Sequence, residues 1–333
     1  MINISKDNHN LSITQYNLEN KQEWDDFVDK SRNGTFLHKI NYLHYHINRF
    51  NDCSLIIKNS DQIVALLPGN IEKEIFYTHQ GLTFGGLITR KETKAEDILT
   101  YFNLINEYLL IEKKISKVIY KAIPHIFSSI PAQEDEYALF RLGARIISSG
   151  LASTIRMDNR QPYSSSRKNN IKKALKYDFE IKIDYSYDEF WVILNNNLMK
   201  FHNTRPVHNI SEIKKLKKDF DNNIRLYSVY LNSECIAGVI IYIFDNVAHA
   251  QYTAASEYGK KISALDYLYD HLINRIFKEI NYFSLGTSVE NNGYYLNEGL
   301  ISQKQGFGGR GVLYQQFEYE VKNTIINKKE NLT

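Results

Sequence analysis

Several features that would assign a class at once are scarce in this chain. Only two of its 333 residues are cysteine and five are proline, and Cys53 and Cys235 each lie inside an apolar run typical of a strand. Two such cysteines indicate reduced core thiols in a cytosolic protein. No apolar run approaches the ~20 residues that span a bilayer, and the N-terminus MINISKDNHN lacks a basic-then-apolar signal. We therefore expect a soluble, cytoplasmic protein.

The common motifs of metal and nucleotide chemistry are also missing. The histidines are neither spaced i, i+4 nor paired with cysteines as zinc ligands are, so we expect no metal. No G-x-x-x-x-G-K-[ST] loop is present, which argues against nucleotide hydrolysis. A net charge of +3 gives no bulk argument for nucleic acid.

What the chain does have is the composition of a globular protein, with 43% apolar, 24% charged and 13% aromatic residues. A chain of this length buries one large core or two ordinary ones, and we favour two. The order of expected elements supports two, because each half begins with a hairpin and continues through a helix, a strand, a second helix and a final strand. The hairpins are Cys53–Lys58 with Ile63–Leu67, and Leu226–Leu231 with Cys235–Phe244.

The remaining elements follow from periodicity. Ala95–Ile111 has one apolar face at helical spacing, and a second helix carries Leu265, Leu268 and Leu272 inward. A short sequence motif also recurs in the two halves, since Leu142-Gly143-Ala144-Arg145 matches Phe307-Gly308-Gly309-Arg310. Hairpins followed by crossover helices predict a mixed sheet, and the repeat predicts a duplicated α/β unit.

A polar, basic segment, DNRQPYSSSRKNNIKKALK, separates the halves at residues 158–176. Pro162 and three serines interrupt regular structure, and a basic helix is expected to start near Ser166. Two interpretations remain open. The segment is either a solvated helix or an anion site at a helix N-terminus, built from Ser164 to Arg167.

The segment Leu285–Arg310 joins a strand end, a polar loop, a short helix with one lysine and a Gly-Phe-Gly-Gly-Arg corner. It resembles the last β-α-β unit of the FemAB-type acyltransferases, which are double-domain relatives of the GNAT N-acyltransferases. Further motifs look like a subgroup encoded with bacterial surface-polysaccharide genes, and the resemblance covers about residues 10–320. These motifs are Tyr120–His125, Pro131–Phe140, Arg205–His208, His249–Tyr252, Leu296–Leu300 and Gln303–Gly308.

The resemblance implies an α/β fold of two tandem GNAT-like domains, each a mixed twisted sheet flanked by helices. We expect them at residues 1–155 and 156–320, the second catalytic, with a polar tail at 321–333. The implied activity is transfer of an acyl group from acyl-coenzyme A to the amine of a nucleotide-linked amino sugar. The nucleotide is expected to be dTDP or UDP, and the product to serve a surface glycan such as O-antigen or capsule. No nucleic acid and no stable membrane insertion are implied.

The coenzyme A position of the resemblance falls on the strand His249–Ala254, with Thr253, and on the loop after it. Backbone N–H groups at a helix start together with lysines suit a diphosphate. The family's loop is Q/R-x-x-G-x-G/A, and this chain has lysine in place of the second glycine. The expected cofactor residues of the loop are Gly259, Lys260, Lys261 and Ser263.

Amide formation from a thioester needs oxyanion donors and a neutral amine. The resemblance implies Glu298 or His249 as the group that takes the amine proton, with Asn297 as a positioner. It gives Lys304 a role in phosphate binding or charge stabilisation. Gln305 departs from the family, where an acidic residue is expected next to that lysine. The expected substrate-binding residues are Gln251, Tyr252, His208, Ser164, Arg167, Gly85 and Gly86.

Two alternatives stay open. One is a FemAB-type aminoacyl transferase that uses aminoacyl-tRNA on a peptidoglycan precursor, although no heptad run for a coiled-coil arm is present. The other is a non-catalytic protein that uses Arg167–Lys176 to bind RNA or an anionic surface. The sequence specifies neither the acyl chain, nor the sugar, nor the oligomeric state.

Overall fold

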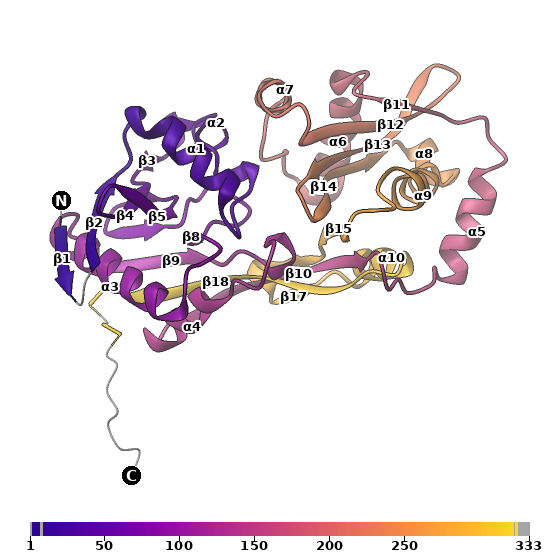
Figure 1. Cartoon of the computed structure of the whole chain (residues 1–333). Coiled ribbons are helices and arrows are strands. Elements are labelled where there is room, and N and C mark those ends of the chain that lie inside the picture. Colours follow the sequence, from indigo (N-terminus) through magenta and orange to yellow (C-terminus); the bar gives the residue numbers. More distant parts are fainter. Residues whose placement is uncertain (1, 7–8, 323, 326–333) are drawn as a thin grey trace, which may run out of the picture. The chain divides into compact units, whose positions relative to one another are not determined.

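A computed structural model describes residues 2–6, 9–322 and 324–325 of the chain (Figure 1). The chain divides into two compact units. Unit 1 comprises Met1–Ser149 and Tyr314–Thr333, and unit 2 comprises Gly150–Leu313. The boundaries fall inside two long strands, β10 (Arg145–Arg156) and β18 (Arg310–Glu320). The division therefore differs from two consecutive halves, because the chain returns to unit 1 at its end.

Unit 1 contains two groups of hydrogen-bonded strands. The first has the order β1 (Ile2–Lys6), β2 (His9–Gln15), β4 (Leu55–Asn59), β5 (Gln62–Leu67) and β8 (Ile88–Thr89). The second has the order β18, β9 (Lys117–Lys121), β7 (Ile75–Tyr77), β6 (Asn70–Glu72) and β3 (Asn51–Asp52). The helices are α1 (Lys21–Lys30), α2 (Ile40–Leu43), α3 (Ala95–Ile111) and α4 (Glu134–Arg141), and the 3-10 turns are η1 (Leu18–Asn20), η2 (Phe36–His38), η3 (Ile47–Arg49) and η4 (His125–Phe127).

Helix α3 has the predicted bounds, because its apolar face and its start signal agree. Ile98, Phe102 and Ile105 are all buried in the core of unit 1, as the i, i+4, i+7 spacing requires. The Asp97 carboxylate accepts a hydrogen bond from the backbone N–H of Lys94, at 2.9 Å, which satisfies one donor at the helix start.

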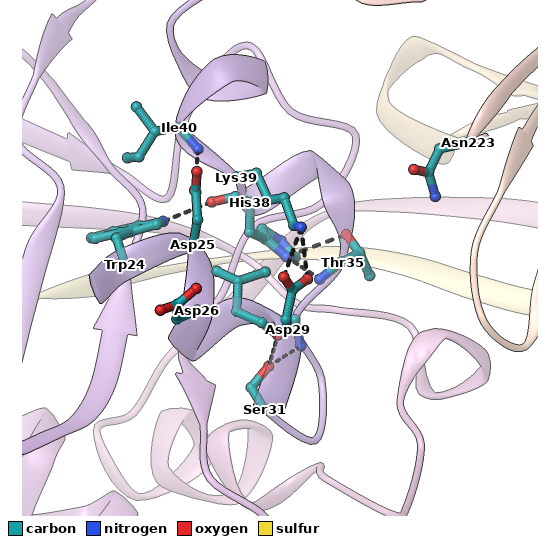
Figure 2. A network of polar contacts seen from close by, with 12 residues as sticks. Trp24, Asp25, Asp26, Asp29, Ser31, Thr35, His38, Lys39, Ile40 and Asn223 are labelled. Carbon is teal, nitrogen blue, oxygen red and sulfur yellow. Dashed lines mark hydrogen bonds and ion pairs between the residues drawn. The ribbon is translucent and has the colours of Figure 1, made fainter. Parts of the chain in front are cut away.

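A polar network fixes the first helices of unit 1 (Figure 2). The Trp24 indole donates to the carbonyl of His38 at 2.8 Å, and the Asp25 carboxylate accepts from the backbone N–H of Ile40 at 2.9 Å. The His38 ring is fully buried and accepts from the backbone N–H of Thr35 through Nδ1, at 3.0 Å. Burial lowers the pKa of His38 to about 3, so this histidine is neutral in the folded protein.

Unit 2 is built on one sheet with the order β11 (Glu180–Ile183), β12 (Ile224–Leu231), β13 (Glu234–Ile243), β14 (Val247–Ala255), β15 (Tyr282–Thr287) and β10. These neighbours are antiparallel except for β14 and β15, which are parallel. The larger helices are α5 (Ser165–Ala174), α6 (Tyr187–His202), α7 (Ile210–Asp219), α9 (Ala264–His271) and α10 (Glu298–Gly306). The smaller elements are α8 (Glu257–Lys261), a π-helical turn η5 (Leu272–Ile276), η6 (Asn291–Gly293) and the two-stranded β16 (Val289–Glu290) and β17 (Tyr295–Leu296).

Both faces of the unit 2 sheet are covered. Leu268 of α9 belongs to one buried cluster with Val239 and Phe283 of the strands. On β13, a Cβ at Gly238 would lie 2.5 Å from the ring of Phe190 in α6. That close approach explains why glycine interrupts an otherwise apolar strand.

The large mixed sheet flanked by helices confirms the predicted α/β class, and both predicted hairpins form. Helices α6 and α7 were not predicted, although they carry the loop that contains His208. Within the residues that the structure describes, no helix is both long and apolar enough to cross a bilayer.

Candidate functional site

The parallel strands β14 and β15 of unit 2 pair over a short distance only. Their register joins Val247–His249 to Tyr282–Ser284, although β14 continues to Ala255. On its other side β14 carries a bulge, since Ile240 and Ile241 of β13 oppose Tyr252 and Ala250 and leave Gln251 as the extra residue. A bulge bends a strand and exposes backbone groups. On its β15 side, β14 has no strand pairing after His249 among the described residues.

Strand β15 also bends at this point. Its register with β10 shifts between Thr287 and Ser284, and Gly286 in between has a φ of +75°, a conformation that glycine adopts without strain. A Cβ at Gly286 would lie 3.8 Å from Cε1 of His249 and 3.9 Å from Nζ of Lys304. The bend therefore brings two of the predicted site residues to the same point.

His249 is buried on β14, and its Nδ1 lies 3.0 Å from the Ser284 hydroxyl. Burial, together with the positive charge of Lys304, lowers the pKa of His249 to about 4. The ring is therefore neutral at physiological pH. A neutral imidazole can accept a proton, although so low a pKa makes it a weak base.

Lys304 reaches back from α10 to the bent end of β15. Its Nζ donates to the carbonyl oxygens of Gly286 at 3.1 Å and Thr287 at 2.6 Å. Burial lowers the pKa of Lys304 to about 8. A mostly charged ammonium with one further N–H therefore lies at the bent end of β15.

The other two predicted catalytic residues stand at the start of α10. Asn297 is the N-cap, and its side chain accepts from the N–H of Leu300 at 3.0 Å and donates to Glu290 at 3.2 Å. Glu298 is exposed. It lies about 240° around the helix from Lys304, from 3.6 residues per turn. The structure thus brings together His249 and Lys304, but not Glu298.

Tyr252, next to the bulge, is joined to the loop between α6 and α7. Its hydroxyl accepts from the backbone N–H of His208 at 3.3 Å and lies 2.6 Å from Nδ1 of the same residue. The Gln251 side chain also bonds to this hydroxyl, and burial raises the pKa of Tyr252 to about 12. The 2.6 Å contact between this hydroxyl and Nδ1 of His208 is a hydrogen bond between the two side chains. Three predicted substrate residues therefore form one contact that fixes the loop beside the bulge.

The loop predicted to bind a diphosphate is occupied by contacts within the chain. A Cβ at Gly259 would lie 2.3 Å from the carbonyl oxygen of Ile236, so packing alone requires this glycine. Lys260 donates to Asn197 and pairs with Glu257, while Lys261 is exposed. The other two predicted cofactor residues are also accounted for. The Thr253 hydroxyl lies 2.7 Å from the Tyr269 hydroxyl, and Ser263 is the N-cap of α9 with a left-handed backbone conformation.

A carboxylate already lies in the first turn of α9. Asp266 is buried and pairs with Arg167 of α5 at 2.5 Å, and the amide of Asn170 lies 3.4 Å away. Lys173 of α5 donates to the carbonyl of Lys261. The N-terminus of α9 is therefore covered by α5 and holds a negative charge of its own. The predicted diphosphate loop therefore lies beside the buried ion pair of Asp266 and Arg167.

Gly85 and Gly86 lie in unit 1, and the local backbone requires glycine at both positions. A Cβ at Gly85 would lie 2.1 Å from the carbonyl oxygen of Thr78, and Gly86 has a φ of +87°. The buried Nζ of Lys121 holds the loop from inside, with its pKa lowered by burial to about 8. It donates to the carbonyls of His79, Gln80 and Leu82 at 3.2, 3.0 and 2.7 Å.

Sequence reasoning missed two residues of this region. Ser284 orients His249, and Asp266 binds Arg167, but each is distant in sequence from its partner and belongs to no recognisable motif. No group of three or more histidine, cysteine or acidic side chains able to hold a metal occurs among the described residues.

Comparison with known proteins agrees with this geometry. The family described as "Acetyltransferase (GNAT) domain" matches residues 193–294, which contain β12 to β15. Over these residues unit 2 is similar to a GNAT acetyltransferase domain. No curated protein matches the chain.

Solved structures similar to the chain extend the likeness to both units. FemX has a TM-score of 0.65 at 10% identity, over 93% of this chain and 97% of that one. The C-terminal domain of a putative lysylphosphatidylglycerol synthetase from Agrobacterium fabrum has a TM-score of 0.59 at 10% identity, over 91% and 92%. A tandem GNAT protein from the clavulanic acid pathway has a TM-score of 0.55 at 10% identity, over 94% and 99%. At such identities the likeness shows a shared fold, and it confirms the tandem GNAT-like architecture.

Proposed function

We propose that the protein is an amide-forming N-acyltransferase that moves an acyl group from acyl-coenzyme A to the amine of a dTDP- or UDP-linked amino sugar for a surface glycan. The observation that carries the proposal is the end of the pairing between β14 and β15, where the bulge at Gln251 and the bend at Gly286 leave an unpaired strand edge near His249 and Lys304. The sugar acceptor rests on the sequence resemblance.

Chemically, the backbone N–H groups on the unpaired edge of β14 supply the oxyanion donors that acyl transfer needs. The Lys304 ammonium adds positive charge near the same edge. An amino-sugar amine with a pKa of about 8, like an α-amino group, is partly neutral at physiological pH. It therefore requires placement more than a strong base. The amine nitrogen bonds to the acyl carbon, the carbon–sulfur bond breaks, and the proton passes to His249 or to water.

One observation favours aminoacyl-tRNA as the acyl donor instead of acyl-coenzyme A. Asp266 and Arg167 occupy the α9 N-terminus, where the resemblance puts the diphosphate of coenzyme A. Aminoacyl-tRNA would not need that position. The FemAB-type aminoacyl transfer therefore remains the competing function.

Turnover with defined donors separates the two. Purified full-length protein is incubated with acyl-coenzyme A of several chain lengths and UDP- or dTDP-amino sugars, and free thiol release is followed together with the mass of the sugar product. Parallel reactions contain aminoacyl-tRNA with a peptidoglycan precursor. Thiol release that depends on the sugar supports the proposal. Product only in the second arm, or in neither, contradicts it.

A further inference from the structure

Unit 2 has an open groove of about 680 Å³ between the start of α5 and one face of α10. This volume is in the range of small-molecule sites, roughly 300–1,000 Å³. It is lined by Ser164, Ser166, Arg167, Gly299, Ser302, Gln303, Gln305, Gly306 and Arg310. We propose that this groove binds the diphosphate of a substrate, in place of the loop at α8 and α9.

The side chains that line the groove are positively charged or neutral. Two of its nine lining residues are arginines, and none of these nine is acidic. Arg167 is neutralised in part by Asp266, and its guanidinium lies over the Phe307 ring at 5.6 Å. Arg310 is exposed, donates to the carbonyl of Gly309 at 2.7 Å, and pairs with no carboxylate among the described residues. The groove therefore offers a cation that a diphosphate can bind bidentately.

Gln305 also lines the groove. Its side-chain amide offers a neutral hydrogen-bond donor, whereas a carboxylate at this place would repel an anion.

The groove is also rigid. The backbone N–H of Ser164 donates to the carbonyl of Gly306 at 2.9 Å. A Cβ at Gly306 would lie 3.0 Å from both Ser164 Oγ and Arg167 Cγ, and one at Gly308 would lie 2.5 Å from the carbonyl oxygen of Gln161. The two glycines thus allow the end of α10 to approach the start of α5, which fixes the floor. Preformed sites lose less free energy on binding than mobile ones.

Both proposed substrates contain a diphosphate, so this inference rests on the proposed function for its chemistry but not for its test. Binding to the full-length protein is measured by titration calorimetry with two probes, coenzyme A and UDP-glucosamine, and glucosamine serves as the probe without phosphate. Three variants are compared: Arg310→Ala, the isosteric Gln305→Glu, and Lys172→Ala, which removes an exposed α5 lysine outside the groove. Thermal melting verifies that each variant is folded.

We expect Arg310→Ala and Gln305→Glu to weaken one probe by about tenfold or more, as loss of a charged hydrogen bond implies, and Lys172→Ala to change it by less than about twofold. Loss for coenzyme A assigns the groove to the donor, and loss for UDP-glucosamine assigns it to the acceptor. Unchanged affinities, equal losses in all three variants, or no wild-type binding of either probe would overturn the inference. Arg310-dependent binding without turnover would sink the proposed function and leave the groove assignment intact.

Discussion

Replacing Lys304 with methionine should separate stability from activity. The ammonium of Lys304 is bonded to two carbonyls at the bent end of β15, yet burial still lowers its pKa from 10.5 to about 8. A shift of this size means that the fold disfavours the charge by about 3 kcal/mol relative to water. Methionine keeps the length of the chain and removes this penalty. It also leaves the carbonyls of Gly286 and Thr287 without their donor, at about 1–3 kcal/mol each if fully buried.

At pH 7 the two effects oppose each other, so we expect the free energy of unfolding to change by less than about 2 kcal/mol. The pH dependence is more diagnostic. The folded pKa is below the unfolded value, so the unfolded state binds more protons between pH 8 and 10.5, and stability rises with pH across this window. Wild type should gain about 3 kcal/mol relative to Lys304→Met over that window.

The measurement is urea unfolding of both proteins at pH 7.5, 9 and 10.5, where other titrating groups cancel in the difference. Parallel stability curves would refute the reasoning about the buried ammonium. Turnover is measured on the same preparations, and Lys304→Met or Lys304→Ala should lose at least about tenfold, because a charge at the reacting centre is removed. Lys322→Ala, which removes an exposed lysine of unit 1, is the matched control. Equal losses would exclude Lys304 from the site.

Three further outcomes follow from the contacts. Burial holds the pKa of His79 at about 3, so the unfolded state takes up a proton before the folded state as the pH falls. Asparagine tolerates the φ of +60° at this position. Between pH 7 and 5, the free energy of unfolding of His79→Asn, measured in urea, should therefore fall by about 2 kcal/mol less than that of wild type. Within α10, Gly306→Ala should lower the melting temperature, because its Cβ would lie 3.0 Å from neighbouring side chains. Gly299→Ala, whose Cβ would lie 3.8 Å from its nearest neighbour, should raise the free energy of unfolding by about 0.5–1 kcal/mol. A change of stability in the same direction for both variants would contradict the packing. Tyr252→Phe removes the hydroxyl that holds His208, and we expect about 1–2 kcal/mol lower stability and faster hydrogen exchange at the 208 amide; unchanged exchange would argue against the contact.

Much of the fold follows from local signals in the sequence. The alternating runs of both hairpins and the apolar face of α3 appear in the structure within a few residues of their predicted ends. Helices α6 and α7 were missed, although Phe190, Trp191 and Leu194 have helical spacing and are buried. Lysine and asparagine residues around these positions make the apolar face difficult to recognise in a chain that is rich in polar residues.

The candidate site was predictable only in part, because its geometry depends on register. Lys304 and His249 could be proposed from the resemblance. No pattern in the sequence shows that β14 carries one extra residue at Gln251. The pair of Arg167 and Asp266 depends on packing of α5 against α9, so the lysine-rich loop that the sequence favoured for a diphosphate lies beside a buried carboxylate.

The return of the last strand to the first unit has a consequence for dissecting the protein. Residues 316–320 of β18 pair with β9, and the Tyr319 hydroxyl donates to the buried Asn106 side chain at 2.9 Å. A fragment cut after residue 155 would expose the edge of β9 and remove that hydrogen bond from the core of unit 1. A circular permutant that begins at residue 314 and ends at residue 313 keeps each unit as one uninterrupted stretch, and it is the form in which either unit should be excised.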